Sequence, residues 1–473
     1  MAFNDSLRQF KTLILDNKLL TFLSIALFAF FISTLSLASS NQSKKSAIAH
    51  CEAEYKEKTE GPTCSVATKD LPLQDPVFFS TEGSSLLLLA PVGSTLVWNK
   101  TTQQSALLCS GSGNKLVKTQ TSQTKITCVR DSTFSLPDGS SVSSTELGCE
   151  AMSIGSFVAS EELCGNDAGV VHKLGFDAGE LGFITYIQSC FDKKRSSVLF
   201  TRHILPGAAI AGLAANVDDI KWTNDGIVGS IDLDIAYTQE KQLKQFTDVL
   251  GSDEQAKKFL VTDKQYLSKG HMTPKGDGIF RTWKYATFFY TNAVPQWKTI
   301  NEGNWNRVES LVRTIAHSLK EDVVVIQGTS GVLSLPHQNG SQIPLSLDIS
   351  GIDVPLWTWK IVKSPSYDAG IAFVTLNNPF ETKVEKSPCD DICEAVGFSQ
   401  KEFKTFTAGY TICCDPNLLL RMIRFAPDEG MVRKVLNYEM LPSGGAMLIT
   451  YMSLIFVSSL YLIMSNFFID INF

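Results

Sequence analysis

The chain has 473 residues, of which 44% are hydrophobic and 19% are charged, and its formal net charge is −6. This length is typical of two or three domains, and the apolar content excludes a wholly disordered chain. The acidic balance argues against a protein that coats nucleic acid through a globally basic surface, although it allows a local basic cleft. No repeat of fixed period occurs, which excludes solenoids, collagen and coiled coils.

Both ends of the sequence carry a long apolar segment. Residues 19–38 contain no charge and are long enough to cross a bilayer. We therefore predict that residues 1–40 are a secretory signal peptide or an uncleaved signal anchor. Residues 446–468 are a second apolar run and predict a C-terminal anchor. This anchor is either a transmembrane segment or the removable tail of a glycosylphosphatidylinositol (GPI) signal, with residues 443–445 as its small-residue site.

The cysteines between these segments indicate an oxidising compartment. There are eleven: Cys51, Cys64, Cys109, Cys128, Cys149, Cys164, Cys190, Cys389, Cys393, Cys413 and Cys414. Behind a secretory segment, this density predicts disulfides. The odd number leaves one thiol over, and Cys51 is the candidate. Three glycosylation sequons, at Asn41, Asn99 and Asn339, agree with an extracellular or lumenal body.

A zinc site is the alternative for the last four cysteines. The pairs Cys389-x3-Cys393 and Cys413-Cys414 have a spacing that zinc sites also use. No histidine lies close by in the sequence, and the secretory context favours bridges.

The body of the chain divides by composition. Residues 41–70 are polar and charged and resemble a stalk, whereas residues 71–160 predict a small β-rich module clipped by disulfides. From about 165 to 425 strands and helices mix, which predicts an α+β domain. We expect strands at 287–294, 322–328, 356–362 and 370–376. A helix is expected over 303–320, with one apolar face made of Trp305, Val308, Val312, Ile315 and Leu319.

Residues that suit phosphate chemistry concentrate between 266 and 313. Residues 261–320 contain nine Lys or Arg against four Asp or Glu, so a cleft here would attract phosphate. His271 is expected in a glycine-containing turn that projects into this cleft. Asn301 and Glu309 are eight residues apart, a little over two helical turns, so both are expected on one side of the helix. Each residue alone has an ordinary structural explanation, such as a loop histidine, a helix cap or a surface pair.

Taken together, three motifs resemble one enzyme family. The segments KGHM (269–272), TNAVPQ (291–296) and NEGNWNRVE (301–309) are similar, in order and spacing, to the DNA/RNA non-specific endonucleases, which are ββα-metal nucleases. The closest likeness is to the secreted double-stranded-RNA-degrading nucleases of insects. The resemblance covers about residues 165–425 and implies a nuclease domain with a central antiparallel sheet. It also implies hydrolysis of phosphodiester bonds in RNA, including double-stranded RNA, and in DNA.

The resemblance assigns roles to individual residues. His271 would be the general base, Asn301 the side-chain ligand of Mg²⁺ (or Mn²⁺), and Glu309 a holder of metal-bound water. Asn292 would orient His271 or the scissile phosphate, and Lys269 would act on the phosphate in catalysis. The remaining substrate-binding candidates beside Lys269 are Lys275, Arg281 and Arg307.

Two positions depart from the family pattern. Ser268-Lys269 stands where the family has Asp-Arg before Gly-His, so the charge is kept but the bidentate fork of arginine is lost. A further arginine that the family uses upstream has only Arg202 as a weak counterpart. Three hypotheses follow: a membrane-tethered, Mg²⁺-dependent endonuclease, a catalytically weakened descendant that binds extracellular nucleic acid, or a structural surface protein in which the β-rich module carries the function.

Overall fold

The computed structural model of the chain describes residues 63–81, 85–99, 104–215, 217–225, 227, 231–384, 386–427 and 431–442. The predicted signal or anchor (1–40), the predicted C-terminal anchor (446–468), Asn41 and Cys51 lie outside these residues. Among the described residues, no helix has both the length and the apolar character needed to span a membrane.

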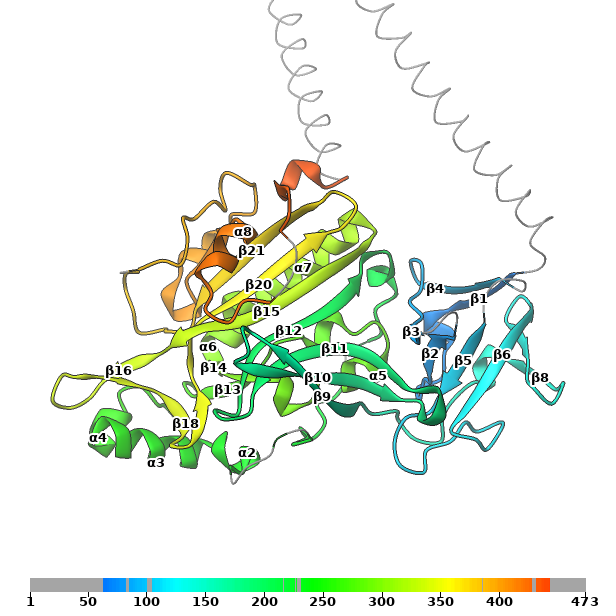
Figure 1. Cartoon of the computed structure of the whole chain (residues 1–473), viewed down its shortest axis with the longest axis horizontal. Helices are drawn as coiled ribbons and strands as arrows, with labels where there is room; N and C mark the ends of the chain where they lie inside the picture. Colours follow the sequence, from blue (N-terminus) through cyan, green and yellow to red (C-terminus); the bar gives the residue numbers. More distant parts are fainter. Residues whose placement is uncertain are drawn as a thin grey trace, which may run out of the picture. The chain divides into compact units, whose positions relative to one another are not determined.

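A nine-stranded sheet is the centre of the fold (Figure 1). Its strands are β9 (Ser156–Cys164), β10 (Gly169–Asp177), β11 (Phe183–Asp192), β12 (Ser197–Pro206), β15 (Asp322–Val332), β20 (Pro355–Ser364), β21 (Ala369–Leu376), β22 (Thr411–Cys414) and β23 (Lys434–Val435). They follow the order β22-β21-β20-β15-β12-β11-β10-β9, and β23 also pairs with β21. All pairs are antiparallel except β21–β23, so the structure confirms the expected central antiparallel sheet.

Three of the four expected strands lie in this sheet, because β15, β20 and β21 contain 322–328, 356–362 and 370–376. The fourth expectation was wrong. Residues 287–292 form turns and a short 3-10 helix (Tyr290–Asn292), and only Ala293 and Val294 are in a strand. Their backbone groups bond locally and to Thr223, whose carbonyl accepts from the Tyr290 amide, so no ladder forms before residue 293.

A hairpin and a long helix form the unit that carries the motifs. The hairpin consists of β13 (Leu267–His271) and β14 (Ala293–Trp297), and after it come α6 (Lys298–Ile300), a π-helical turn (Asn301–Trp305) and α7 (Asn306–Leu319). This is the ββα arrangement that the resemblance implied. The expected helical face is buried, since α7 packs against β15 and β21 in one apolar cluster.

The turn before α7 is broken at Gly303. Its backbone is non-helical, with φ −92° and ψ −119°. A Cβ at this position would lie 2.6 Å from the carbonyl oxygen of Ala408, so the close approach requires glycine. The helical register therefore does not run from Asn301 to Glu309, and their spacing of eight residues does not by itself put them on one face.

The N-terminal β-rich module has its own six-stranded sheet. In spatial order the strands are β3 (Leu87–Leu88), β2 (Val77–Ser80), β5 (Ser105–Leu108), β6 (Gln123–Arg130), β7 (Thr133–Ser135) and β8 (Ser141–Ser143). Next to it β1 (Thr63–Ala67) pairs with β4 (Thr95–Asn99). Residues 63–70, which composition assigned to the stalk, thus begin the module, and β9 from Ser156 on belongs to the larger sheet.

The module packs against α5 (Arg281–Tyr285) of the nuclease region. Phe78 and Phe280 have ring centroids 5.7 Å apart, and both belong to one apolar cluster with Trp283. The Asp75 carboxylate accepts a hydrogen bond from the backbone N–H of Arg281 (3.2 Å). Burial raises the pKa of Asp75 to about 7, against the opposing charge of Arg281.

Short elements complete the described chain. The helices are α2 (Leu233–Ala236), α3 (Gln239–Leu250), α4 (Asp253–Ala256) and α8 (Pro416–Met422), and the strand pairs are β16 (Ser334–Pro336) with β17 (Gln342–Pro344) and β18 (Ser346–Asp348) with β19 (Gly351–Asp353). The sequon residue Asn339 is exposed in the turn between β16 and β17, and Asn99 is the last residue of β4.

All ten described cysteines form disulfides. The pairs are Cys64–Cys128, Cys109–Cys149, Cys164–Cys190, Cys389–Cys414 and Cys393–Cys413. The zinc alternative is therefore wrong, because the four sulfurs that it needs are bonded to one another.

Candidate active site

Strand β13 separates the motif residues onto two faces. Side chains alternate along a strand, so Lys269 and His271 share one face and Ser268 lies on the other. Trp222, Tyr237, Phe288 and Tyr290 contact the first of these faces, which we call the aromatic face. The pairing of His271 with Ala293 and of Ser268 with Gln296 fixes this arrangement.

His271 ends the strand and does not lie in the turn expected for it. The preceding Gly270 is needed for close packing, because a Cβ there would lie 2.7 Å from Oε1 of Gln296. The His271 ring is 4.5 Å from Trp222 and 5.0 Å from Phe288 between centroids, and its buried Nε2 has no hydrogen-bond partner among the described residues. Burial lowers the pKa of His271 to about 3, so the imidazole is neutral at physiological pH.

Asn301 is brought to the other face of the hairpin. Its side-chain N–H donates to the Ser268 hydroxyl (3.3 Å), which in turn donates to the carbonyl of Gln296 (3.0 Å). The amide oxygen of Asn301 is thereby left as the atom available to a metal. The described contacts of His271 do not include Asn301 or Glu309.

Glu309 lies on the first turn of α7 and is partly buried. Burial raises the pKa of Glu309 to about 7, although the nearby positive charge of Lys360 opposes this shift. Arg313, one turn further along α7, adds a second cation. Glu309 is thus at the edge of a group of buried charges.

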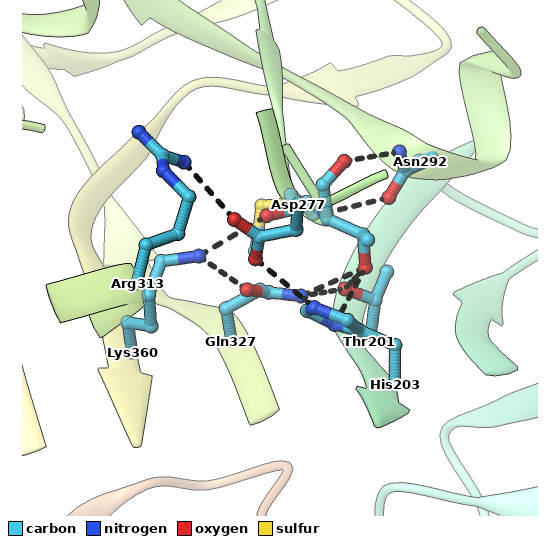
Figure 2. A network of polar contacts seen from close by, with 9 residues as sticks. Thr201, His203, Asp277, Asn292, Arg313, Gln327 and Lys360 are labelled. Carbon is cyan, nitrogen blue, oxygen red and sulfur yellow. Dashed lines mark hydrogen bonds and ion pairs between the residues drawn. The ribbon is translucent and has the colours of Figure 1, made fainter. Parts of the chain in front are cut away.

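These charges belong to a buried polar network that was not predicted (Figure 2). The Asp277 carboxylate accepts from Nη1 of Arg313 (3.0 Å) and from Nε2 of His203 (3.0 Å). Since the carboxylate only accepts, His203 holds its proton on Nε2, and its Nδ1 accepts from the Thr273 hydroxyl (3.3 Å). Burial lowers the pKa of His203, so this ring stays neutral.

Gln327 and Lys360 extend the network across the sheet. The Gln327 amide donates to the hydroxyls of Thr201 (2.7 Å) and Thr273 (2.8 Å). The Lys360 ammonium donates to the Gln327 amide oxygen and to the carbonyl of Met272 (3.4 Å). We define the polar network as Thr201, His203, Thr273, Asp277, Arg313, Gln327 and Lys360.

Asn292 connects the end of the hairpin to this network. Its side-chain N–H groups donate to the carbonyls of Thr273 and Thr287 (both 2.9 Å), and its oxygen accepts from the Thr273 amide (2.8 Å). The side chain is fully buried. Its amide is therefore committed to the backbone just after His271, which it holds in place.

The other substrate-binding candidates differ in how near they lie to His271. Lys275 is close to it, because its Nζ lies 5.9 Å from the ring centroid of Phe288, which contacts the His271 ring. Lys275 donates to Asp219 (2.6 Å) and to the carbonyl of Val217 (3.1 Å). Arg281 begins α5 beside the module, and Arg307 lines a groove of about 620 Å³ that also contains Glu302 and Glu402.

Arg307 and Arg202 both lie apart from the aromatic face. On α7, Arg307 is two residues from Glu309, about 200° around the helix. Arg202 lies on β12 and lines a separate cavity with Gln188. The structure does not bring either arginine to His271.

Comparisons with known proteins identify the class. A family model described as DNA/RNA non-specific endonuclease matches residues 166–418. The chain belongs to this family, which consists of metal-dependent nucleases, and it is a phosphodiester hydrolase.

Relatives extend the match beyond the nuclease region. The chain is similar to a salivary endonuclease of Lutzomyia longipalpis, with 34% identity over 347 residues that are 72% of this chain and 78% of that protein. Salivary protein Tsal2A of Glossina morsitans morsitans is 25% identical over 368 residues, 77% of this chain and 91% of Tsal2A. The mitochondrial nuclease EXOG of Xenopus laevis is 36% identical over 138 residues, 26% of this chain and 37% of EXOG.

Proposed function

We propose that this protein is a Mg²⁺-dependent, sugar-non-specific endonuclease that cleaves RNA, including double-stranded RNA, and DNA. The observation that carries the proposal is the aromatic face of β13, where a neutral, partly buried imidazole and a lysine ammonium stand two residues apart. The base can deprotonate a water molecule, and the cation beside it can neutralise a phosphate oxygen. Contacts to phosphate and sugar carry no sequence information, so cleavage would be largely indifferent to sequence.

In this reaction His271 takes the proton of the attacking water and Lys269 binds an oxygen of the scissile phosphate. Asn292 acts through the backbone, because its amide holds the residues that follow His271. Glu309 would accept hydrogen bonds from water at the site in its ionised form, which the nearby charges of Lys360 and Arg313 favour against burial.

Asn301 offers a ligand atom that suits a hard divalent cation. The oxygen of Asn301 is a ligand type that Mg²⁺ accepts, and this ion commonly keeps most of its waters, so a carboxylate cluster is not required. Asn301 would hold the ion, with Glu309 binding its waters. When bound, Mg²⁺ or Mn²⁺ supplies charge neutralisation at the phosphate and at the leaving oxygen.

The proposed location is the secretory pathway, with the nuclease region extracellular or lumenal and tethered to a membrane by one or both apolar ends. Five disulfides and the similarity to salivary proteins support secretion. Phosphatidylinositol phospholipase C distinguishes the two C-terminal alternatives. Release from intact cells supports a GPI anchor, whereas retention supports a transmembrane segment.

The deciding experiment uses the full chain from a secretory eukaryotic host, kept in mild detergent. Double-stranded RNA and plasmid DNA are incubated with Mg²⁺ or with EDTA, using the wild type, His271→Ala and His317→Ala. His317 is an exposed histidine on α7 and serves as the matched control. We expect Mg²⁺-dependent cleavage that is lost in His271→Ala, by about 10³-fold or more, and retained in His317→Ala.

A second candidate is a nucleic-acid-binding protein without turnover. Two observations favour it: Ser268-Lys269 replaces the Asp-Arg of the family pattern, and His271 makes no described contact with Asn301. Tight binding of RNA without cleavage by wild type or variant, at any divalent metal concentration, would select this candidate over the enzyme.

A further inference from the structure

The Lys269 side chain ends among three aromatic rings. Its Nζ lies 5.1 Å from the ring centroid of Tyr290 and 5.9 Å from those of Tyr237 and Trp222. The rings come from separate parts of the chain, which the fold brings together around one ammonium. We call these three residues the cage. At such distances the face of each ring attracts a cation.

The cage is held by contacts of its own. The Tyr290 hydroxyl donates to Asp234 (2.6 Å), and the Tyr290 backbone N–H donates to the carbonyl of Thr223 (3.0 Å). The ring of Tyr290 is 5.8 Å from both Tyr237 and Trp222. The direction of the lysine is thus set by residues that are themselves fixed.

The cage leaves the hydrogen-bond donors of Lys269 unused. Within the described part of the chain, its ammonium has no hydrogen-bond acceptor and no ion pair, although the side chain is half-buried. Aromatic faces neutralise part of the charge but accept no strong hydrogen bond. The charge of Asp234 acts on this ammonium without an ion pair, so its three donors are left to solvent or to a ligand, and a phosphate oxygen is a suitable acceptor.

We propose that Trp222, Tyr237 and Tyr290 are positioning residues for phosphodiester cleavage, which hold the Lys269 ammonium beside His271 for an oxygen of the scissile phosphate. This inference rests on the proposed nuclease function and deepens it. The cage also accounts for lysine at a position where the family pattern has arginine. A guanidinium is oriented by its planar fork, whereas an ammonium is a point charge on a flexible stem that the surrounding rings must orient.

A double-mutant cycle in the full chain tests the cage. Tyr290→Leu and Tyr290→Phe are made in the wild type and in Lys269→Ala, and kcat and KM are measured on double-stranded RNA with Mg²⁺. We expect Lys269→Ala to lower kcat/KM by about 10²-fold. Tyr290→Leu is expected to lower it by about tenfold, and Tyr290→Phe, which keeps the ring face, to recover most of that loss. Tyr367→Leu, an exposed tyrosine elsewhere, is the control and is expected to match the wild type.

The decisive comparison is the effect of Tyr290→Leu in the Lys269→Ala background. If the ring acts through the lysine, the second substitution adds nothing there, because coupled residues are not additive. An equal loss in both backgrounds would overturn the proposal and leave Tyr290 with a structural role only. Should Tyr290→Leu fail to fold, as seen by circular dichroism, the same cycle is run with Trp222→Leu and Trp222→Phe, since Trp222 is only partly buried.

A binding measurement separates this inference from the proposed function. Affinity for fluorescein-labelled double-stranded RNA in EDTA is measured for the same variants, so that no turnover is needed. If the wild type cuts nothing, the endonuclease proposal fails and with it the role of the cage in cleavage. The positioning of Lys269 for a phosphate oxygen is still supported when Tyr290→Leu weakens binding only where Lys269 is present. Equal weakening with and without Lys269 overturns the cage in either case.

Discussion

The aromatic face of β13 and the polar network begin within two residues of each other, yet they treat polar atoms in opposite ways. On the aromatic face, Nε2 of His271 and the ammonium of Lys269 have no hydrogen-bond partner among the described residues. In the polar network, which starts at Thr273, both oxygens of Asp277 and both ring nitrogens of His203 are engaged. Between these two regions, the network residues that hold the fold are satisfied internally, whereas the two side chains of β13 that are proposed to act on substrate are not.

The largest expected effect comes from removing Asp277, the centre of the polar network, which tests whether this network stabilises the fold. Asp277→Ala would leave the buried cation of Arg313 without its carboxylate and His203 without its acceptor. We expect the free energy of unfolding to fall by about 3–5 kcal/mol, as when one partner of a buried ion pair is lost. Urea denaturation of the full chain measures this change. A loss below about 1 kcal/mol would show that the network is not a scaffold.

Asn292→Ala sharpens the contrast between positioning and catalysis. The substitution leaves the amide and carbonyl of Thr273 and the carbonyl of Thr287 without their partner, so we expect a loss of about 2–3 kcal/mol in unfolding free energy. Activity measured well below the unfolding temperature is expected to fall much less than in His271→Ala. Complete loss of cleavage by a folded Asn292→Ala protein would instead indicate contact with the reacting groups.

The smallest expected effect is on the pH dependence of the free energy of unfolding, to which His271 on the aromatic face contributes. Burial lowers the pKa of His271 in the folded protein to about 3, whereas an unfolded histidine has a pKa of about 6.5. Between these values the unfolded chain binds a proton that the folded chain does not, so stability falls as the pH is lowered from 7 towards 4. In His271→Phe this part of the pH dependence disappears, which at pH 5 amounts to about 2 kcal/mol. The free energy of unfolding is measured for both proteins at pH 5 and pH 8. An equal change between the two pH values in the wild type and in His271→Phe would contradict the assignment.

Much of the fold follows from local sequence patterns. Apolar runs predicted β15, β20 and β21, and the apolar face with Trp305, Val308 and Val312 predicted α7. In such elements apolar residues form a short run or recur at a fixed spacing, and both patterns are visible in the sequence. Segment 287–292 also looks like a strand, because it is rich in aromatic side chains. These side chains are buried, but they are carried by turns and a 3-10 helix, so their burial does not indicate a strand.

The candidate site was only partly predictable. Motif order identified His271, Asn301 and Glu309, but helical periodicity between the last two fails at Gly303, where the backbone leaves the helix. The polar network joins single polar residues of distant strands, such as His203 and Lys360, and the sequence does not show that these residues meet. The only sequence signal was a charged residue within an otherwise apolar strand, as Lys360 is in LWTWKIV (356–362).

The break at Gly303 connects the start of α7 to the segment enclosed by the last two disulfides. Asn304, the next residue, donates to the carbonyls of Glu402 and Gly409 (both 2.7 Å), so residues 402–409 brace the turn that carries Asn301. That bracing segment lies inside the loop closed by Cys389–Cys414 and Cys393–Cys413. When these cysteines are reduced, the two disulfides no longer hold the ends of the segment that contains residues 402–409. The nuclease would therefore mature only after leaving the reducing cytosol, and the RNA of the cell that makes it would be spared.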